Sequence, residues 1–198
     1  MSEIILASGS EIRAQMLRDA GLVFQVVPAR IDEAAIKASL LAENAPPRDV
    51  ADVLAGLKAE RVAGKNPDDL VIGADQVLEL DGSIFSKPAD LIEAKAQLRA
   101  LAGKTHRLHS AAVIHQGQRP IWRHISRVDL TMRDMSEAFL DRYIDQAGPE
   151  ILYSVGAYQI EATGIRLFSK IDGPYHAILG LPLIEMLNFL HSAGHIQS

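Results

Sequence analysis

The run His106–Met132, HRLHSAAVIHQGQRPIWRHISRVDLTM, constrains the fold more than any other part of the chain. Its pattern is typical of two long strands joined by the short turn Gln116-Gly117-Gln118. A turn of this length joins antiparallel neighbours, because parallel strands need a crossover of about a dozen residues or more. The sequence therefore predicts a hairpin, and with it a sheet that is not purely parallel.

Patterns typical of helices and strands alternate along the rest of the chain. A buried strand is predicted at LVIGADQVLELDG, residues 70–82, which ends in the turn signal Asp81-Gly82. The alternation, interrupted by the hairpin, favours a mixed α/β sheet flanked by helices over a doubly wound parallel sheet. Further strands are expected at residues 4–7, 24–27 and 164–173, and helices at 10–20, from about 47 to 64, from 88–90 to about 101, from 136 to Gly148-Pro149 and from 182 onward.

Composition excludes several classes of protein. The 198 residues suffice for one large domain or two small lobes with a real core, and 48% hydrophobic against 23% charged residues argues against disorder. The formal net charge of −5 argues against a broad basic face for duplex nucleic acid. No apolar run approaches the roughly 18 residues of a membrane span. The N-terminus lacks the features of a signal peptide, and the absence of cysteine fits a reducing compartment, so we expect a cytoplasmic protein.

The segment Ser8-Gly9-Ser10 separates the first predicted strand from the first predicted helix and permits two interpretations. Ser8 and Glu11 have the spacing of a capping box, in which a serine accepts a hydrogen bond from the helix N-terminus. Small residues before a helix also suit a phosphate, since free backbone N–H groups attract anions. The local pattern alone favours the cap.

Asp75 is the most suspicious carboxylate, because it ends the apolar run 70–74. A buried acid is costly unless it is paired, protonated or bound to a metal. Backbone donors at the end of the strand are an equally good explanation when Asp75 is considered alone. A second acidic point is Asp32-Glu33, which by itself indicates a solvated loop or a helix cap.

Three cations accompany these acids. Arg13 lies early in the first predicted helix, Lys58 lies on an apolar helical face, and Lys87 precedes Pro88. Taken singly, each is typical of a surface charge with a buried stem. Taken together with the two acids and the serine turn, they form a set suited to phosphate chemistry: cations that neutralise charge, a metal ligand and a base.

Short blocks along nearly the whole chain resemble those of the Maf family of nucleoside triphosphate pyrophosphatases, proteins once discussed as inhibitors of septum formation. The order of the blocks is also that of the family. They are LASGSEIR at 6–13, IDE at 31–33, LKA at 57–59, IGADQV at 72–77, KP at 87–88, GKTH at 103–106, GAYQIE at 156–161 and ILGLP at 178–182.

The resemblance implies a single domain, residues 1–198, with a two-lobed mixed sheet around a deep cleft, similar to inosine triphosphate pyrophosphatases. It also implies a homodimer and a divalent metal, Mg²⁺ or Mn²⁺. The implied reaction is the hydrolysis of a nucleoside triphosphate to the monophosphate and pyrophosphate.

The same resemblance assigns roles by matched position. Asp75 becomes the proton acceptor for the attacking water, and Glu33 and Asp75 become metal ligands. Lys58 and Lys87 join the catalytic set and hold the triphosphate, together with the remaining matched residues, Ser8, Ser10 and Arg13.

Two residues depart from the family's opening block. Glu11 stands where the family usually has proline, and Ala14 stands where it has a second arginine. An added acid and a lost cation would weaken the affinity for triphosphate or shift the preferred substrate. A nucleotide-binding regulatory or septation-linked protein with little turnover is therefore an alternative function. A purely structural domain, in which the charged residues never converge, is a third.

The choice of substrate is indicated by three positions. Gln76 and Glu161 resemble the family members that prefer 7-methyl-GTP, whereas those that prefer dTTP and UTP have threonine and glutamine there. A glutamate can accept hydrogen bonds from N1–H and N2–H₂ of guanine, and the positive charge of the methylated base strengthens the attraction. Ile12 departs from the tryptophan of that group and removes a stacking surface. The pattern favours 7-methyl-GTP.

Overall fold

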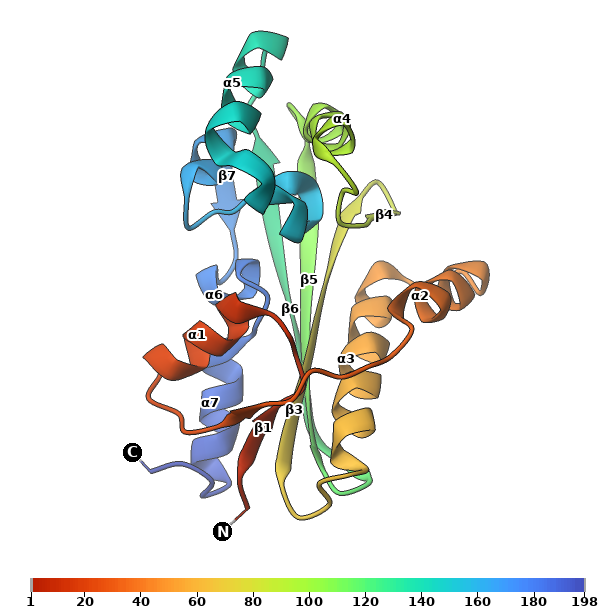
Figure 1. The fold of residues 1–198 in the computed structure, drawn as a ribbon, viewed down its shortest axis with the longest axis vertical. Helices are drawn as coiled ribbons and strands as arrows, with labels where there is room; N and C mark the ends of the chain where they lie inside the picture. The colour runs from red at the N-terminus through yellow and green to blue at the C-terminus, as the bar shows by residue number, and fades with distance from the viewer. Residues whose placement is uncertain (1, 198) are drawn as a thin grey trace. The chain divides into compact units, whose positions relative to one another are not determined.

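A computed structural model describes residues 2–197, which form a mixed α/β fold (Figure 1). Among these residues, one sheet has seven strands, β1 (Ile4–Leu6), β2 (Gln25–Val26), β3 (Leu70–Leu80), β4 (Ser83–Phe85), β5 (Thr105–Gln116), β6 (Arg119–Met132) and β7 (Phe168–Asp172). The strand order is β2-β1-β3-β5-β6-β7, with β4 beside β3. Strand β1 is parallel to β2 and β3, whereas β4 and β7 are antiparallel to their neighbours. The predicted mixed sheet and its hairpin are confirmed, since only two residues join β5 to β6.

Helices flank the sheet. The α-helices are α1 (Glu11–Asp19), α2 (Glu33–Ala42), α3 (Pro47–Ala63), α4 (Leu91–Leu101), α5 (Glu137–Ala147), α6 (Tyr175–Ile178) and α7 (Leu183–Ser192). Three 3₁₀ segments, η1 (Gly148–Tyr153), η2 (Val155–Ala157) and η3 (Thr163–Leu167), precede β7 in the described part of the chain. The strand expected within 164–173 is therefore shorter than predicted. Within residues 2–197, no helix has the length and apolar character that crossing a membrane requires.

The chain forms two compact units. The first contains the residues up to Gln76, His109–Ser126 and those from Pro174 on, and the second contains Val77–Leu108 and Arg127–Gly173. Each unit has its own packing, which the following paragraphs describe separately.

In the first unit, helices cover both faces of β1 and β3. Ile4 and Leu6 pack with side chains of α1 and α7, whereas Ile5 and Ala7 pack with side chains of α3. Figure 1 shows these helices on opposite sides of the two strands. Because successive side chains of a strand point to opposite faces, a short continuous apolar run here is buried on both sides.

Gly73 is a point of very close contact between β3 and α3. A Cβ atom at this position would lie 2.1 Å from the carbonyl oxygen of Ala55 and 2.6 Å from the nitrogen of Ala59. Both alanines are completely buried in α3. No side chain fits between the strand and the helix, so this contact sets the distance between them.

Helix α2 was not predicted as a helix. It begins after Asp32, whose side chain accepts a hydrogen bond from the backbone N–H of Ala35 at 3.0 Å. The helix-cap interpretation of Asp32-Glu33 is therefore correct. None of the residues of α2 is fully buried, and Ile36 and Leu40 are only partly covered. Its apolar residues are spread around the helix and do not form the single stripe that indicates a core-facing helix.

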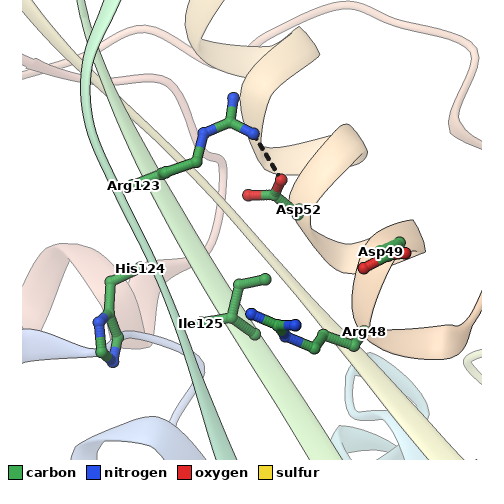
Figure 2. Close-up of a pocket in the computed structure, with 6 residues that line it drawn as sticks. All are labelled: Arg48, Asp49, Asp52, Arg123, His124 and Ile125. Carbon is green, nitrogen blue, oxygen red and sulfur yellow. Dashed lines mark hydrogen bonds and ion pairs between the residues drawn. The ribbon is translucent and has the colours of Figure 1, made fainter.

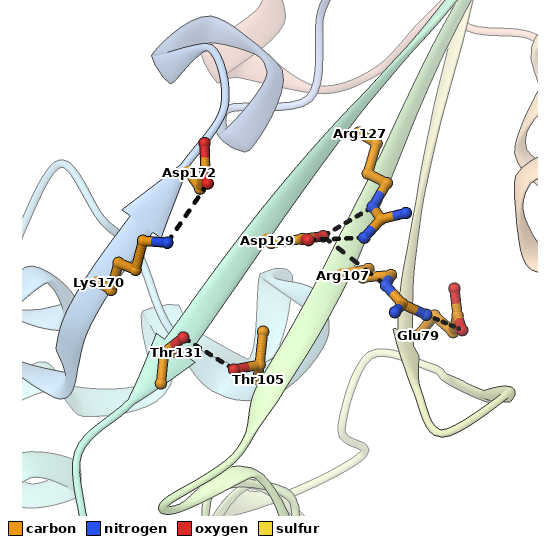
Figure 3. Close-up of polar contacts among 8 residues, drawn as sticks. All are labelled: Glu79, Thr105, Arg107, Arg127, Asp129, Thr131, Lys170 and Asp172. Carbon is orange, nitrogen blue, oxygen red and sulfur yellow. Dashed lines mark hydrogen bonds and ion pairs between the residues drawn. The ribbon is translucent and has the colours of Figure 1, made fainter.

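In the second unit, the sheet has one polar and one apolar face. Arg107 on β5 donates to Glu79 on β3 at 3.1 Å, and Arg127 donates twice to Asp129 along β6, at 2.6 and 2.7 Å (Figure 3). The residues between them, Leu108, Val128 and Leu130, are buried. The two arginines are about half-exposed, and exposed ion pairs contribute little to stability. The ion pairs therefore make this face of the sheet polar but contribute little to the free energy of unfolding.

A buried polar pair lies in the apolar side of the second unit. The Nε2 atom of His106 on β5 lies 2.8 Å from the hydroxyl of Tyr158, and the Tyr158 ring meets Phe168 edge to face at 4.9 Å between centroids. Burial lowers the pKa of His106 from 6.5 to about 4, and burial also raises the pKa of Tyr158. Both groups are therefore neutral at pH 7.

Acid is expected to destabilise this unit through His106. In the unfolded chain the imidazole takes up a proton near pH 6.5, but in the folded chain only near pH 4. Between these pH values the unfolded state binds more protons than the folded state. The contribution of neutral His106 to the free energy of unfolding is therefore fully present above pH 6.5 and falls by about 2–3 kcal/mol between pH 7 and pH 4.5. Urea unfolding at both pH values checks this, with His106→Gln as the variant that cannot titrate. A wild-type loss no larger than that of the variant would contradict the assignment.

Candidate active site

The serine turn receives the Arg13 side chain instead of capping α1. The hydroxyl of Ser8 accepts hydrogen bonds from the backbone N–H of Ser10 at 3.3 Å and from Nη1 of Arg13 at 3.2 Å. Helix α1 begins at Glu11 with Ser10 as its N-cap, and the Ser10 side chain makes no capping bond. The predicted capping box from Ser8 to Glu11 is therefore wrong, because the helix starts two residues too late for it.

Arg13 connects three separate segments of the first unit. Its Nε atom donates to the carbonyl oxygen of Gly180 at 2.8 Å, and Nη1 donates to the carbonyl oxygen of Ala74 at 3.2 Å in addition to Ser8. Removal from water lowers the pKa of the Arg13 guanidinium, while the negative charges of Asp75 and Glu33 oppose that shift. The cation is thus held at the end of β1, beside the acids of the predicted site.

Lys58 brings the two predicted acids together. Its Nζ atom lies 2.7 Å from Oδ1 of Asp75 and 3.0 Å from Oε1 of Glu33. The side chains of Lys58 and Asp75 are only 9% exposed, whereas that of Glu33 is 50% exposed. Asp75 lies on β3, Lys58 on α3 and Glu33 at the start of α2. The paired explanation for a buried Asp75 is therefore correct, since its partner is an ammonium group.

The acids of this cluster suit a hard divalent cation only in part. Carboxylate oxygens are the ligands that Mg²⁺ prefers, and Mg²⁺ is commonly bound by one or two carboxylates together with substrate phosphates and water. Across residues 2–197, no group of three or more histidine, cysteine, aspartate and glutamate side chains could hold a metal. Asp75 and Glu33 therefore fit a metal that is completed by phosphate oxygens of a ligand.

The predicted specificity residues occupy different places. The Nε2 atom of Gln76 on β3 is 2.9 Å from the Ser110 hydroxyl and 2.9 Å from each of the carbonyl oxygens of Ala177 and Ile178. Ile12 is partly buried on α1, and Glu161 is exposed in the second unit.

The structure gathers most of the predicted site in the first unit. Lys87, between β4 and α4, belongs to the second unit, as does Glu161. The predicted residues that the first unit holds near one another are Ser8, Ser10, Arg13, Glu33, Lys58, Asp75 and Gln76.

The two departures from the family pattern lie outside this cluster of charges. The Glu11 carboxylate pairs with Arg18 at 2.6 Å, and both side chains are exposed. Ala14 is buried in the apolar core beside Met16 and Leu17. The carboxylate of Glu11 is therefore paired with another arginine, and Ala14 belongs to the apolar core. Neither residue is among the hydrogen-bond partners of Arg13 in the described part of the chain.

A pocket of about 280 Å³ in the first unit was not indicated by the sequence. Arg123 on β6 donates to Asp52 on α3 at 2.7 Å, and Figure 2 shows the His124 side chain pointing away from this pair. The two arginines of the pocket are balanced by two aspartates, so it lacks the excess of positive charge that a triphosphate needs. Its lining residues are Arg48, Asp49, Asp52, Arg123, His124 and Ile125.

The sequence also did not indicate the partners of Gln76, which are Ser110 and the carbonyl groups of Ala177 and Ile178. Ser110 lies in the run Ser110-Ala111-Ala112 of β5, where small residues indicate packing alone. Gly180 gave no signal of its own and was named only within the block ILGLP at 178–182, which carried the family resemblance.

Comparison with known proteins agrees with the resemblance seen in the sequence. The family model for Maf-like proteins matches residues 3–193. A protein of Ruegeria sp. (strain TM1040), named nucleoside triphosphate pyrophosphatase, is 50% identical over 99% of this chain and 98% of its own length. A protein of Caulobacter vibrioides with the same name is 48% identical over 98% and 97% of the two chains. A protein of Brucella abortus, named 7-methyl-GTP pyrophosphatase, is 48% identical over 93% of each. With its blocks in the family's order, a mixed α/β fold and a match over nearly its whole length, the chain belongs to the family of Maf-like proteins.

Proposed function

We propose that this protein is a nucleoside triphosphate pyrophosphatase, which hydrolyses its substrate to the nucleoside monophosphate and pyrophosphate. The observation that carries the proposal is the pairing of buried Asp75 with Lys58, with Glu33 and Arg13 beside them. The names of relatives that are about half identical over nearly the whole chain support the same reaction.

In the proposed mechanism, Asp75 takes the proton of the attacking water. The water oxygen forms a bond to the α-phosphorus, the bond from that phosphorus to the bridging oxygen breaks, and pyrophosphate leaves with the electron pair. Lys58 holds Oδ1 of Asp75 at 2.7 Å and so orients the carboxylate. A fixed carboxylate within reach of the water is what general base catalysis requires.

The cations of the site offset the charge of the triphosphate. Negative charge grows on the bridging and non-bridging oxygens as the bond breaks, and fixed cations lower the barrier to that step. Arg13, with Ser8 and Ser10 around it, binds the phosphate chain, and Lys87 of the second unit is assigned to the same task. A bound Mg²⁺ or Mn²⁺, held by Asp75 and Glu33, would supply further neutralisation of the phosphate charge.

For the substrate, we propose 7-methyl-GTP before dTTP and UTP. Glu161 is exposed and can accept from the two donors on the guanine edge. The relative from Brucella abortus that carries the name 7-methyl-GTP pyrophosphatase supports this choice. Ile12, which is partly buried on α1, offers no aromatic stacking surface to the base.

A panel of triphosphates tests both levels of the proposal. Pyrophosphate release is measured from 7-methyl-GTP, GTP, dTTP, UTP and ATP with Mg²⁺ and with Mn²⁺. We expect release that depends on the metal and is fastest with 7-methyl-GTP. A preference for dTTP and UTP would contradict the proposed substrate but would agree with the proposed reaction. Tight nucleotide binding without any pyrophosphate at high protein concentration would overturn the reaction and favour a regulatory binding protein.

A further inference from the structure

Ser110 is a completely buried serine whose hydroxyl serves two partners. It accepts a hydrogen bond from Nε2 of Gln76 at 2.9 Å and donates one to the carbonyl oxygen of Ala177 at 2.6 Å. Its exposed fraction is 0%. A buried hydroxyl with both functions satisfied is costly to remove, because its partners then lose a hydrogen bond away from water.

Gln76 and Ser110 together hold the end of α6. The two N–H bonds of the Gln76 amide are shared among Ser110 and the carbonyl oxygens of Ala177 and Ile178, and Ser110 donates to the first of these carbonyls. The last carbonyl groups of a helix have no partner within it, and a helix as short as α6 has little stability of its own. The two side chains of β3 and β5 therefore fix where α6 ends.

The chain leads from the end of α6 directly to Arg13. Gly180 follows Ile178 by two residues, and its carbonyl oxygen accepts the hydrogen bond from Nε of Arg13 at 2.8 Å. The backbone of Gly180 has φ +98°, and a Cβ atom there would lie 3.1 Å from both Nε and Nη2 of Arg13. The Gly180 backbone is thus in close contact with the guanidinium and bonded to it, so a shift of this segment moves the cation.

We propose that Ser110, together with Gln76, is a positioning residue that fixes the Gly180 carbonyl and thereby orients Arg13 toward the phosphate chain. The proposal rests on the proposed function of Arg13 as a triphosphate ligand. It gives Gln76 a second effect besides the choice of base. A change at Gln76 or Ser110 alters the binding of the phosphates whichever base the nucleotide carries.

The structural step can be tested without enzyme activity. In ¹⁵N NMR spectra, the Arg13 Nε–H signal, identified by its absence in Arg13→Lys, should exchange slowly with water in the wild type because it is bonded to Gly180. We expect faster exchange in Ser110→Ala and wild-type exchange in Ser126→Ala, a second buried serine of the same unit. Unchanged Arg13 exchange in Ser110→Ala would overturn the proposal.

A double-mutant cycle tests the functional step. Inorganic tripolyphosphate, which has no base, is the binding probe, and its dissociation constant is measured by calorimetry. We expect Ser110→Ala to weaken its binding by about 5- to 10-fold, an effect of the size of one net hydrogen bond, because Ser110 acts on the ligand only through Arg13. In the Arg13→Ala background the same change should have an effect of less than about 2-fold, since the group through which Ser110 acts is gone. Equal effects in both backgrounds would overturn the proposal.

Steady-state kinetics distinguish a positioning role of Ser110 from a general loss of structure. In Ser110→Ala, KM should rise by a similar factor with kcat changed less, and the ratio of rates between 7-methyl-GTP and UTP should stay as in the wild type. If Ser110→Ala does not fold, Gln76→Met enters the same cycle, because it removes the bonds from Gln76 to Ser110 and to the carbonyl oxygens of Ala177 and Ile178. A protein that binds tripolyphosphate through Arg13 but releases no pyrophosphate would refute the proposed function and leave this inference standing.

Discussion

Replacing Asp75 by asparagine is expected to lower the rate of pyrophosphate release by about 10²- to 10⁴-fold, the usual contribution of a general base. Asparagine has the same shape and its carbonyl oxygen can still accept the hydrogen bond from Lys58, which lies 2.7 Å from Oδ1. What the variant lacks is the basic oxygen that takes the proton from water. We expect the loss in kcat, with nucleotide binding altered far less.

The matched control is Asp52→Asn. Asp52 lies on α3 and is partly buried in an ion pair with Arg123, but it belongs to the pocket of balanced charges and not to the Lys58 cluster. The rate of pyrophosphate release by this variant should stay within about 2-fold of the wild type, because the ion pair of Asp52 is with Arg123 and not with Lys58. Steady-state rates and thermal unfolding of both variants provide the measurement. An undiminished rate in Asp75→Asn would remove Asp75 from the role of base.

Replacing Gly73 by alanine is expected to destabilise the protein by about 3 kcal/mol or more, at the upper end for an overpacked core. The added Cβ atom would lie 2.1 Å from the carbonyl oxygen of Ala55, so β3 or α3 must move. Backbone atoms cannot give way as the end of a flexible side chain can. Because α3 carries Lys58 and β3 carries Asp75, we expect activity to fall together with stability.

Gly56→Ala, on the helix α3 that Gly73 contacts, is expected to give the opposite result. Nothing lies within 4 Å of a Cβ atom at Gly56, and alanine is favoured over glycine inside a helix by about 0.5–1 kcal/mol. Urea unfolding of both variants therefore separates overpacking from helix propensity. Equal stability of Gly73→Ala and the wild type would contradict the prediction, because β3 and α3 could then move apart at no cost in free energy.

Local sequence signals predicted much of the fold because neighbouring residues produce them. The turn at Gln116-Gly117-Gln118 and the helix start at residue 136 depend on a few adjacent residues and are both confirmed. At the helix start, the Ser136 side chain accepts from the N–H of Phe139 at 3.3 Å. Helix α2 was missed because none of its side chains is fully buried and its apolar residues are spread around the helix instead of forming one stripe. The capping box at Ser8 failed because the Arg13 guanidinium, in place of the helix, binds the Ser8 hydroxyl.

The site was predicted less completely, since its contacts join distant segments. An acid at the end of an apolar run marked Asp75, but nothing local to the sequence shows that Lys58, one helix earlier, is its partner. The family resemblance supplied the remaining roles. Ser110 gave no signal at all, because its importance depends on carbonyl groups 67 residues later in the chain.

The bonds of Arg13 restrict the direction from which an anion can reach it. A guanidinium has five N–H bonds, and here Nε is directed at Gly180 while Nη1 is shared between Ser8 and Ala74. Within residues 2–197, the two hydrogens of Nη2 have no hydrogen-bond acceptor, so these are the ones that remain for a ligand. An incoming oxygen must therefore approach along one edge of the planar group. A lysine at this position would keep the charge but would lose that directionality.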